Sequence, residues 1–394
     1  MRRAALLLVS LMVGVPICAA EIPSSLFPVE PAVNSQRGFA VALDGAWLAV
    51  GAPQEEQGET RNAGAVRLFR FEDGLWIEKQ RLASPEPEDT GRFGHSVSLS
   101  GITLAVGAAG EGKVYAYTRD GSEWFLRAIV QDEEGVERLG QSVALDGDWL
   151  AIGAVGSVHL LNRFAGEWSE LLPPLQGDPA APDERFGYSV SLRGDTLAVG
   201  APGAEESKGA VYVFQAGEEG WNRVARRTAV DGGPGDQLGY AVAVGANGSE
   251  VAAGAPAADA PGAVNQGALY VFEEGEGWSD GAGGRLAVPG IDGGDHLGHA
   301  VSIDGDLLAA GAPFGSPDNS GAVHILIRHG LPWIPVNPVE AGNAGFLDLC
   351  GFSVAADSDR VAAGAVLLDQ GGSSAGSAHT FKCTGTGCTE EVRP

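Results

Sequence analysis

The stretch FGYSVSLRGDTLAVGAP at residues 186–202, followed by GAVYVF at residues 209–214, decides the fold of this chain. The run SVSL alternates polar and apolar side chains, as a strand with one buried face does. After the turn at residues 193–195, the run TLAVG is continuously apolar, which is typical of a strand covered on both faces. Gly194 suits the turn because glycine adopts positive φ without a steric penalty. Pro202 cannot donate to a sheet, so we expect it to end the second strand.

The same pattern recurs six more times along the chain. Each copy has an anchor glycine just before its first strand, a Gly-Ala pair at the end of its second strand and a β-rich third strand. The anchor glycines are Gly38, Gly94, Gly140, Gly187, Gly239, Gly298 and Gly351. A unit of this size cannot bury its own apolar faces, so the seven copies must stack on one another.

We therefore predict an all-β fold, a seven-bladed β-propeller of four-stranded antiparallel blades. The repeats begin near residues 37, 92, 138, 185, 237, 296 and 349. The seventh copy runs out after its third strand, at Phe381. We predict that an N-terminal strand at residues 24–29 supplies the outer strand of the seventh blade and closes the ring. The C-terminal tail at residues 383–392 is the alternative.

These motifs resemble the FG-GAP repeat family, named for anchors such as Phe186-Gly187 and Gly200-Ala201-Pro202. The resemblance covers about residues 36–381, and it is closer to the short bacterial exported members than to the propeller of integrin alpha subunits. It implies a β-propeller that binds proteins or supports cell adhesion. Integrin-like blades often carry an Asp-x-Asp-x-Asp-Gly loop that binds Ca²⁺, whereas the equivalent hairpins here are too short to supply enough oxygen ligands. We therefore expect no cofactor, with Ca²⁺ as the alternative.

The first twenty residues have the pattern of a secretory signal peptide. Two arginines precede an apolar run to Ile17, and small residues follow up to Ala20. We expect cleavage near Ala20, which leaves residues 21–394 as a single propeller domain. The sequence predicts a secreted or periplasmic protein without a membrane span.

The charge of the chain excludes some classes of partner. It carries 25 Lys and Arg against 51 Asp and Glu, a formal net charge of −26. Nucleic acid requires a basic surface, and so does electrostatic docking on anionic lipid, so we expect neither. A net charge far from zero favours solubility, and we expect a monomer.

Three cysteines remain after the expected cleavage: Cys350, Cys383 and Cys388. An oxidising compartment permits a disulfide. Any two of the three could pair, and the sequence does not choose between the pairings. Their spacing matches no zinc site.

One face of the predicted propeller is the candidate ligand face. The loops between second and third strands share this face with the connections between blades, and both vary in length and composition. The residue after each anchor glycine is expected there, near the mouth of the central channel. These residues either stack on a sugar or peptide ligand or pack between blades. The candidates for ligand binding are His95, Gln141, Tyr188, Tyr240 and His299, with Phe39 and Phe352 at the same position.

Acidic residues recur three positions before the anchor glycine. They are Glu137, Glu184, Asp236, Asp295 and Asp348. Such side chains either cap backbone N–H groups of the tight turn that leads into the strand or form an acidic ring for a divalent cation. The candidates for a weak cation site are Asp231, Asp236, Asp292 and Asp295.

No catalytic motif is evident. The sequence lacks a His-Glu-x-x-His motif. We expect an exported, non-enzymatic binding or adhesion scaffold that recognises a protein or glycan through the variable loops of one face. The alternative is a secreted glycan-active hydrolase or lyase with carboxylates at the channel mouth.

Overall fold

A computed structural model describes residues 34–131, 137–177, 184–218, 220–276, 278, 284–316, 319–328, 330, 332–342, 345–367 and 375–391. The expected signal peptide and the predicted strand at residues 24–29 lie outside these residues. The described chain is all-β apart from short helical turns such as α1 (Ala204–Ser207) and the 3₁₀ turn Glu274–Glu276. Within it, no helix combines the length and the apolar character needed to cross a membrane.

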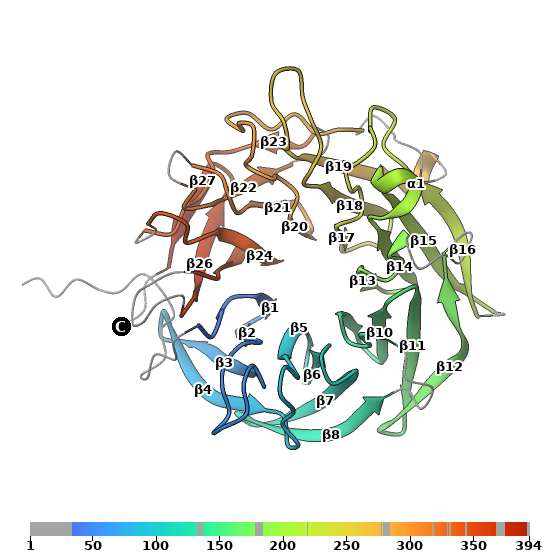
Figure 1. Ribbon diagram of the computed structural model, residues 1–394, viewed down its shortest axis with the longest axis vertical. Helices are drawn as coiled ribbons and strands as arrows, with labels where there is room; N and C mark the ends of the chain where they lie inside the picture. Colours follow the sequence, from blue (N-terminus) through green and yellow to red (C-terminus); the bar gives the residue numbers. More distant parts are fainter. Residues whose placement is uncertain are drawn as a thin grey trace, which may run out of the picture.

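Seven antiparallel sheets stand around a common axis, and the chain visits them in order (Figure 1). Blades 1 and 2 contain β1 (Ala40–Asp44), β2 (Trp47–Ala52), β3 (Ala65–Glu72), β4 (Leu75–Ala83), β5 (Phe93–Ser100), β6 (Thr103–Ala108), β7 (Lys113–Asp120) and β8 (Glu123–Gln131). Blades 3 and 4 contain β9 (Ser142–Asp146), β10 (Trp149–Ala154), β11 (Ser157–Phe164), β12 (Glu167–Gln176), β13 (Ser189–Arg193), β14 (Thr196–Ala201), β15 (Ala210–Gly217) and β16 (Gly220–Arg227).

Blades 5 to 7 complete the circle. They contain β17 (Ala241–Val244), β18 (Glu250–Ala255), β19 (Ala268–Glu273), β20 (Ala300–Asp304), β21 (Leu307–Ala312), β22 (Ala322–Ile327), β23 (Ile334–Pro335), β24 (Cys350–Asp357), β25 (Arg360–Ala365), β26 (Ser377–Thr384) and β27 (Gly387–Glu390). In blade 5 the place of the fourth strand is taken by Arg285, which forms an antiparallel bridge with Tyr270, and by Leu286. The predicted seven-bladed β-propeller is confirmed.

The outer strand of blade 7 comes from the C-terminal tail. The sheet order is β24-β25-β26-β27, so β27 occupies the position that we assigned to residues 24–29. This corrects the N-terminal assignment in favour of its alternative. The tail forms the strand because a short turn after Thr384 folds it directly back onto β26, with Lys382 opposite Thr389.

The strand register defines two faces of the ring. In blade 1, Ala40 lies opposite Gly51, Ala52 opposite Ala65, and Ala65 opposite Ala83. The starts of the first strands, the loops between second and third strands, and the connections between blades therefore share one face, which we call the loop face. The two hairpins of each blade lie on the other, the hairpin face.

Glycines hold neighbouring blades in close contact. The anchor glycine Gly239 of blade 5 has φ +82°, and a Cβ added to it would lie 2.4 Å from the carbonyl oxygen of Ala210. A Cβ on Gly200 of blade 4 would lie 1.9 Å from the carbonyl oxygen of Gly239. A side chain at either position would push the two blades apart, which explains the two glycines in each repeat.

The ring closes through the same contacts. A Cβ on Gly364 of blade 7 would lie 1.8 Å from the carbonyl oxygen of Gly38 in blade 1. The Ser353 hydroxyl donates to the same oxygen at 2.7 Å, and Arg37 N–H donates to Ala375 O at 3.1 Å. Figure 1 shows blade 1, in blue, beside blade 7, in orange-red. Blades 1 and 7 therefore join as any other neighbours do.

Hydrogen bonds also join blades on the hairpin face. Gly194 N–H donates to Asp146 Oδ2 at 2.6 Å, and Gly45 N–H donates to Asp357 Oδ2 at 2.5 Å. The acidic residues of these hairpins are thus used to hold the next blade.

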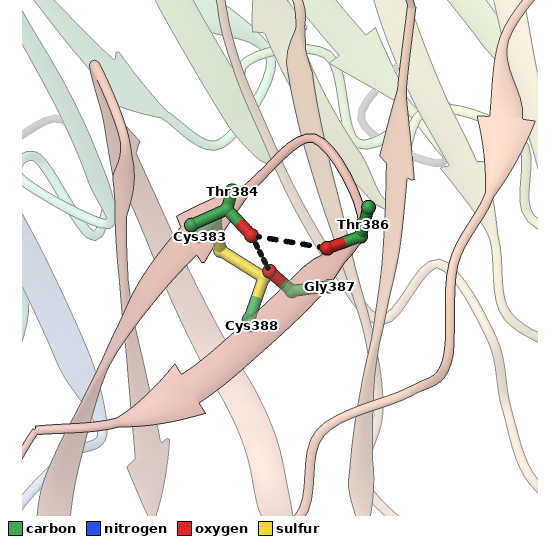
Figure 2. The surroundings of a disulfide bond; sticks show 5 residues. All are labelled: Cys383, Thr384, Thr386, Gly387 and Cys388. Atoms are coloured by element: carbon green, nitrogen blue, oxygen red, sulfur yellow. Dashed lines mark hydrogen bonds between the residues drawn. A yellow bond between two sulfur atoms is a disulfide. The ribbon is translucent and has the colours of Figure 1, made fainter.

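The disulfide joins Cys383 to Cys388, which lie opposite each other in β26 and β27 (Figure 2). The Thr384 hydroxyl donates to Gly387 O at 3.2 Å beside it. Of the three pairings that the sequence left open, the structure selects this one. The third cysteine, Cys350, has a free thiol and is fully buried.

This arrangement predicts a thiol pattern. Burial raises the pKa of the Cys350 thiol to about 12, and only a thiolate reacts readily. Iodoacetamide at pH 8 should leave native residues 21–394 unlabelled. After unfolding without a reductant, mass spectrometry should find one alkyl group, on Cys350. Labelling of Cys383 or Cys388 under these conditions would contradict the assigned disulfide.

Candidate functional site

An identical tight turn brings the chain to the first strand of every blade. In blade 4, Arg185 has φ +56°, and Tyr188 N–H donates to its carbonyl oxygen at 3.1 Å. The left-handed residues at this position are Gln36, Arg92, Arg138, Arg185, Gln237, His296 and Leu349. Such backbone costs about 1–2 kcal/mol per residue for a side chain other than glycine, so the seven turns are held by the packing of the blades.

These turns place the residue after each anchor glycine on the loop face, at the innermost strand of its blade (Figure 1). We call this set the axial ring: Phe39, His95, Gln141, Tyr188, Tyr240, His299 and Phe352. The structure thus brings together all five predicted ligand-binding residues.

Neighbouring members of the axial ring touch. Ring centroids are 4.9 Å apart for Tyr188 and Tyr240, 5.0 Å for Tyr240 and His299, and 4.6 Å for His299 and Phe352. The series continues from Phe352 to Phe39 at 5.1 Å and from Phe39 to His95 at 4.9 Å. Packing between blades, one of the two roles expected from sequence, is therefore confirmed for six of the seven. Every member nevertheless keeps a partly exposed side chain.

The two histidines of the axial ring are neutral near pH 7. Burial lowers the pKa of His299 to about 4, and its Nδ1 donates to Phe352 O at 3.0 Å. Burial, with the nearby cations of Arg92 and Arg138, also lowers the pKa of His95 to about 4. Among the described residues, His95 Nδ1 has no hydrogen-bond partner. That nitrogen is buried, so a ligand would reach it only if the His95 ring turned.

Three consecutive turns carry arginine beside the axial ring. Arg185 lies over the Tyr188 ring, with its guanidinium carbon 4.2 Å from the ring centroid. Arg92 and Arg138 lie close enough to His95 to depress its pKa. Within the described part of the chain none of the three forms an ion pair, in a protein whose net charge is −26. This arc was not predicted from the sequence, although arginine two positions before three successive anchor glycines was a visible signal.

A cavity of about 760 Å³ opens on the loop face between blades 2 and 3. Arg92, Lys113 and Arg138 line it together with Glu111 and Glu137. His95 N–H donates to Arg92 O at 3.0 Å, and Gln141 N–H donates to Arg138 O at 3.0 Å, so the cavity adjoins the axial ring. Its volume lies within the range of small-molecule sites, roughly 300–1,000 Å³.

The acidic residues three positions before the anchor glycine stabilise the local turn. Asp236 accepts from Gly233 N–H at 2.7 Å, and Asp295 accepts from Asp292 N–H at 2.8 Å. Asp348 accepts from Gly345 N–H at 2.5 Å. Of the two roles that the sequence left open, backbone capping is confirmed for Asp236, Asp295 and Asp348. In blade 4, Glu184 instead accepts from the Tyr212 hydroxyl at 3.0 Å.

Three of the four candidate cation ligands, Asp231, Asp236 and Asp295, use their carboxylates on protein partners. Asp231 accepts from the Tyr270 hydroxyl at 2.9 Å and pairs with Arg285 at 3.4 Å. Asp236 and Asp295 cap their own turns. Among the described residues, no three His, Cys, Asp or Glu side chains gather in a way that could hold a metal ion.

Two Ser–His–Glu arrangements resemble catalytic triads in geometry. Ser377 Oγ lies 2.8 Å from His379 Nε2, and His379 Nδ1 lies 2.7 Å from Glu390. Ser377 and His379 are completely buried, so no substrate can reach them. The second arrangement, Ser157–His159–Glu170, repeats this strand position in blade 3. Their recurrence at one repeat position indicates a packing role.

The comparison with known families agrees with this geometry. A family model of the FG-GAP repeat matches residues 175–214, 221–272 and 285–326, which span blades 4 to 6. No curated protein matches the sequence. The matched segments share the strand order, anchor glycines and turns of the other blades, although the sheet of blade 5 has three strands. The chain is therefore a seven-bladed β-propeller whose blades 4 to 6 match the FG-GAP repeat.

Proposed function

We propose that this propeller is an exported, non-enzymatic scaffold that binds a glycan or protein on its loop face. The observation that carries the proposal is the axial ring, where seven equivalent turns converge on partly exposed aromatic and polar side chains. Rigid scaffolds that present loops commonly place their binding residues in this way. Export rests on the signal-peptide pattern of residues 1–20.

The opposite face offers less to a ligand. Its hairpin carboxylates accept backbone N–H groups of neighbouring blades, as Asp146 and Asp357 do. The loop face instead combines the cavity, the arginines and the unpartnered nitrogen of His95. A ligand therefore gains most of its polar contacts on the loop face.

An array of glycans and proteins probed with residues 21–394 tests the function. We expect binding without turnover of the bound compound. Release of a cleaved product from any glycan on the array would favour the hydrolase or lyase instead.

A substitution in the axial ring tests the location. Tyr188→Ala should weaken binding of the array ligand about tenfold, because an aromatic contact contributes about 1 kcal/mol beyond its buried area. The matched control is Phe164→Ala, since Phe164 is an aromatic residue 82% exposed on the hairpin face. Titration calorimetry measures both variants. Equal affinities for the two variants would contradict the site.

A further inference from the structure

Building on the proposed function, we infer that the cavity between blades 2 and 3, with the adjoining arc of the axial ring, takes a uronic-acid residue of an acidic glycan. The site combines three kinds of contact that together fit a carboxylated sugar: cations for the carboxylate, acceptors for the hydroxyls, and aromatic rings for the C–H faces.

The cations are the first observation. Arg92 and Arg138 line the cavity, and Arg185 lies over the ring of Tyr188 in the next blade. All three lack an ion-pair partner in the described chain, although Asp and Glu outnumber Lys and Arg 51 to 25. A guanidinium binds a carboxylate through two parallel hydrogen bonds, which gives direction as well as attraction.

The acceptors are the second observation. Glu111 lines the same cavity, and its Oε2 accepts from the Tyr115 hydroxyl at 2.5 Å. Its Oε1 is buried and has no hydrogen-bond partner among the described residues, as is also true of His95 Nδ1. A buried acceptor without a partner is costly, and a sugar hydroxyl could satisfy it once the Glu111 side chain turns toward the cavity. An inorganic anion could not, because it would be repelled by the carboxylate.

The aromatic side chains are the third observation. The rings of Tyr188 and Tyr240 are tilted by 52° with centroids 4.9 Å apart, and both residues remain partly exposed, with Arg185 over Tyr188. Their rings can cover the apolar face of a sugar. The opposite arc, with Phe352 and Phe39, has no cation of its own at the preceding turn, where Leu349 and Gln36 stand. The ring is thus charged on one side only.

The test is a calorimetric titration of residues 21–394 with short oligomers of galacturonate, glucuronate, mannuronate and guluronate. Their neutral methyl esters and sodium sulfate are titrated in parallel. We expect at least one acidic oligomer to bind, its ester to bind about tenfold more weakly or worse, and sulfate to compete poorly. Rising ionic strength should weaken the binding of the acid, since salt screens charge pairs.

The test variant is a double substitution that combines Arg92→Gln and Arg138→Gln. Gln36 and Gln237 occupy this turn position in other blades, so glutamine is compatible with its backbone. We expect a loss of about tenfold to hundredfold in affinity for the acid, from the loss of charged hydrogen bonds. Arg127→Gln is the control, because Arg127 is an exposed arginine on the outer strand β8. Circular dichroism checks folding, and Arg138→Gln alone serves if the double variant does not fold.

Three results would overturn the inference. These are the absence of binding by all four acids, equal affinity for acid and ester, and unchanged affinity in the arginine variant. Binding of sulfate as strong as that of the oligomers would also reject a sugar ligand. A further outcome is that the array identifies a neutral glycan or a protein as the ligand. If Tyr188→Ala weakens the binding of that ligand, the proposed function stands and this inference fails.

Discussion

Gly239→Ala should lower the free energy of unfolding by about 4 kcal/mol, the combined cost of a left-handed alanine and of overpacking. The added methyl would lie 2.4 Å from Ala210 O, and Gly239 has φ +82°. Backbone atoms cannot rotate away as a side chain can, so blades 4 and 5 must separate. Urea denaturation followed by circular dichroism measures the loss.

Gly194→Ala isolates the conformational part of that loss. Gly194 also has positive φ, +56°, but a Cβ there would meet nothing within 4 Å. We expect it to cost about 1 kcal/mol, from backbone strain alone. Similar losses in the two variants would show that the close contact between blades contributes little to the stability of the ring.

His324→Tyr should remove about 3 kcal/mol of the pH dependence of stability between pH 7 and pH 4. Burial lowers the pKa of His324 to about 4, and the side chain is 4% exposed. The unfolded chain has a pKa near 6.5, so between these values the unfolded state binds more protons than the folded state. Stability from this group is therefore full above pH 6.5 and is lost as the pH falls towards 4.

Tyrosine is the natural replacement, because Tyr115, Tyr212 and Tyr270 occupy the same repeat position. Tyrosine does not titrate between pH 4 and pH 7, whereas His95 and His299 titrate in both the wild type and the variant. The difference between wild type and variant therefore reports His324. Unfolding free energies from urea titrations at pH 7 and pH 4 provide the measurement. An equal loss in both proteins would mean that His324 is not held neutral by burial.

The fold was predictable because the same local pattern appears seven times, once in each repeat. A Cβ added to any anchor glycine would lie 2.1–2.8 Å from a backbone carbonyl oxygen of the neighbouring blade, so these glycines mark the blade boundaries in the sequence. The outer strand of blade 7 was assigned wrongly. A four-residue strand such as β27 has too little pattern to be distinguished from a tail, and its pairing depends on the turn after Thr384.

The site was predictable only in part. The position after the anchor glycine pointed to His95, Tyr188 and Tyr240, because the repeat fixes where that residue lies. The arginines were missed because their importance comes from what surrounds them: no ion-pair partner among the described residues and, for Arg92 and Arg138, a shared cavity. The disulfide also required the register of β26 and β27, which the sequence does not contain.

A crystal structure of residues 21–394 with the ligand selected on the array tests the central claim most directly. The claim predicts that the ligand lies on the loop face, in contact with Tyr188 or His95. A ligand seated on the hairpin face, or along the outer strands between blades 3 and 4, would contradict it.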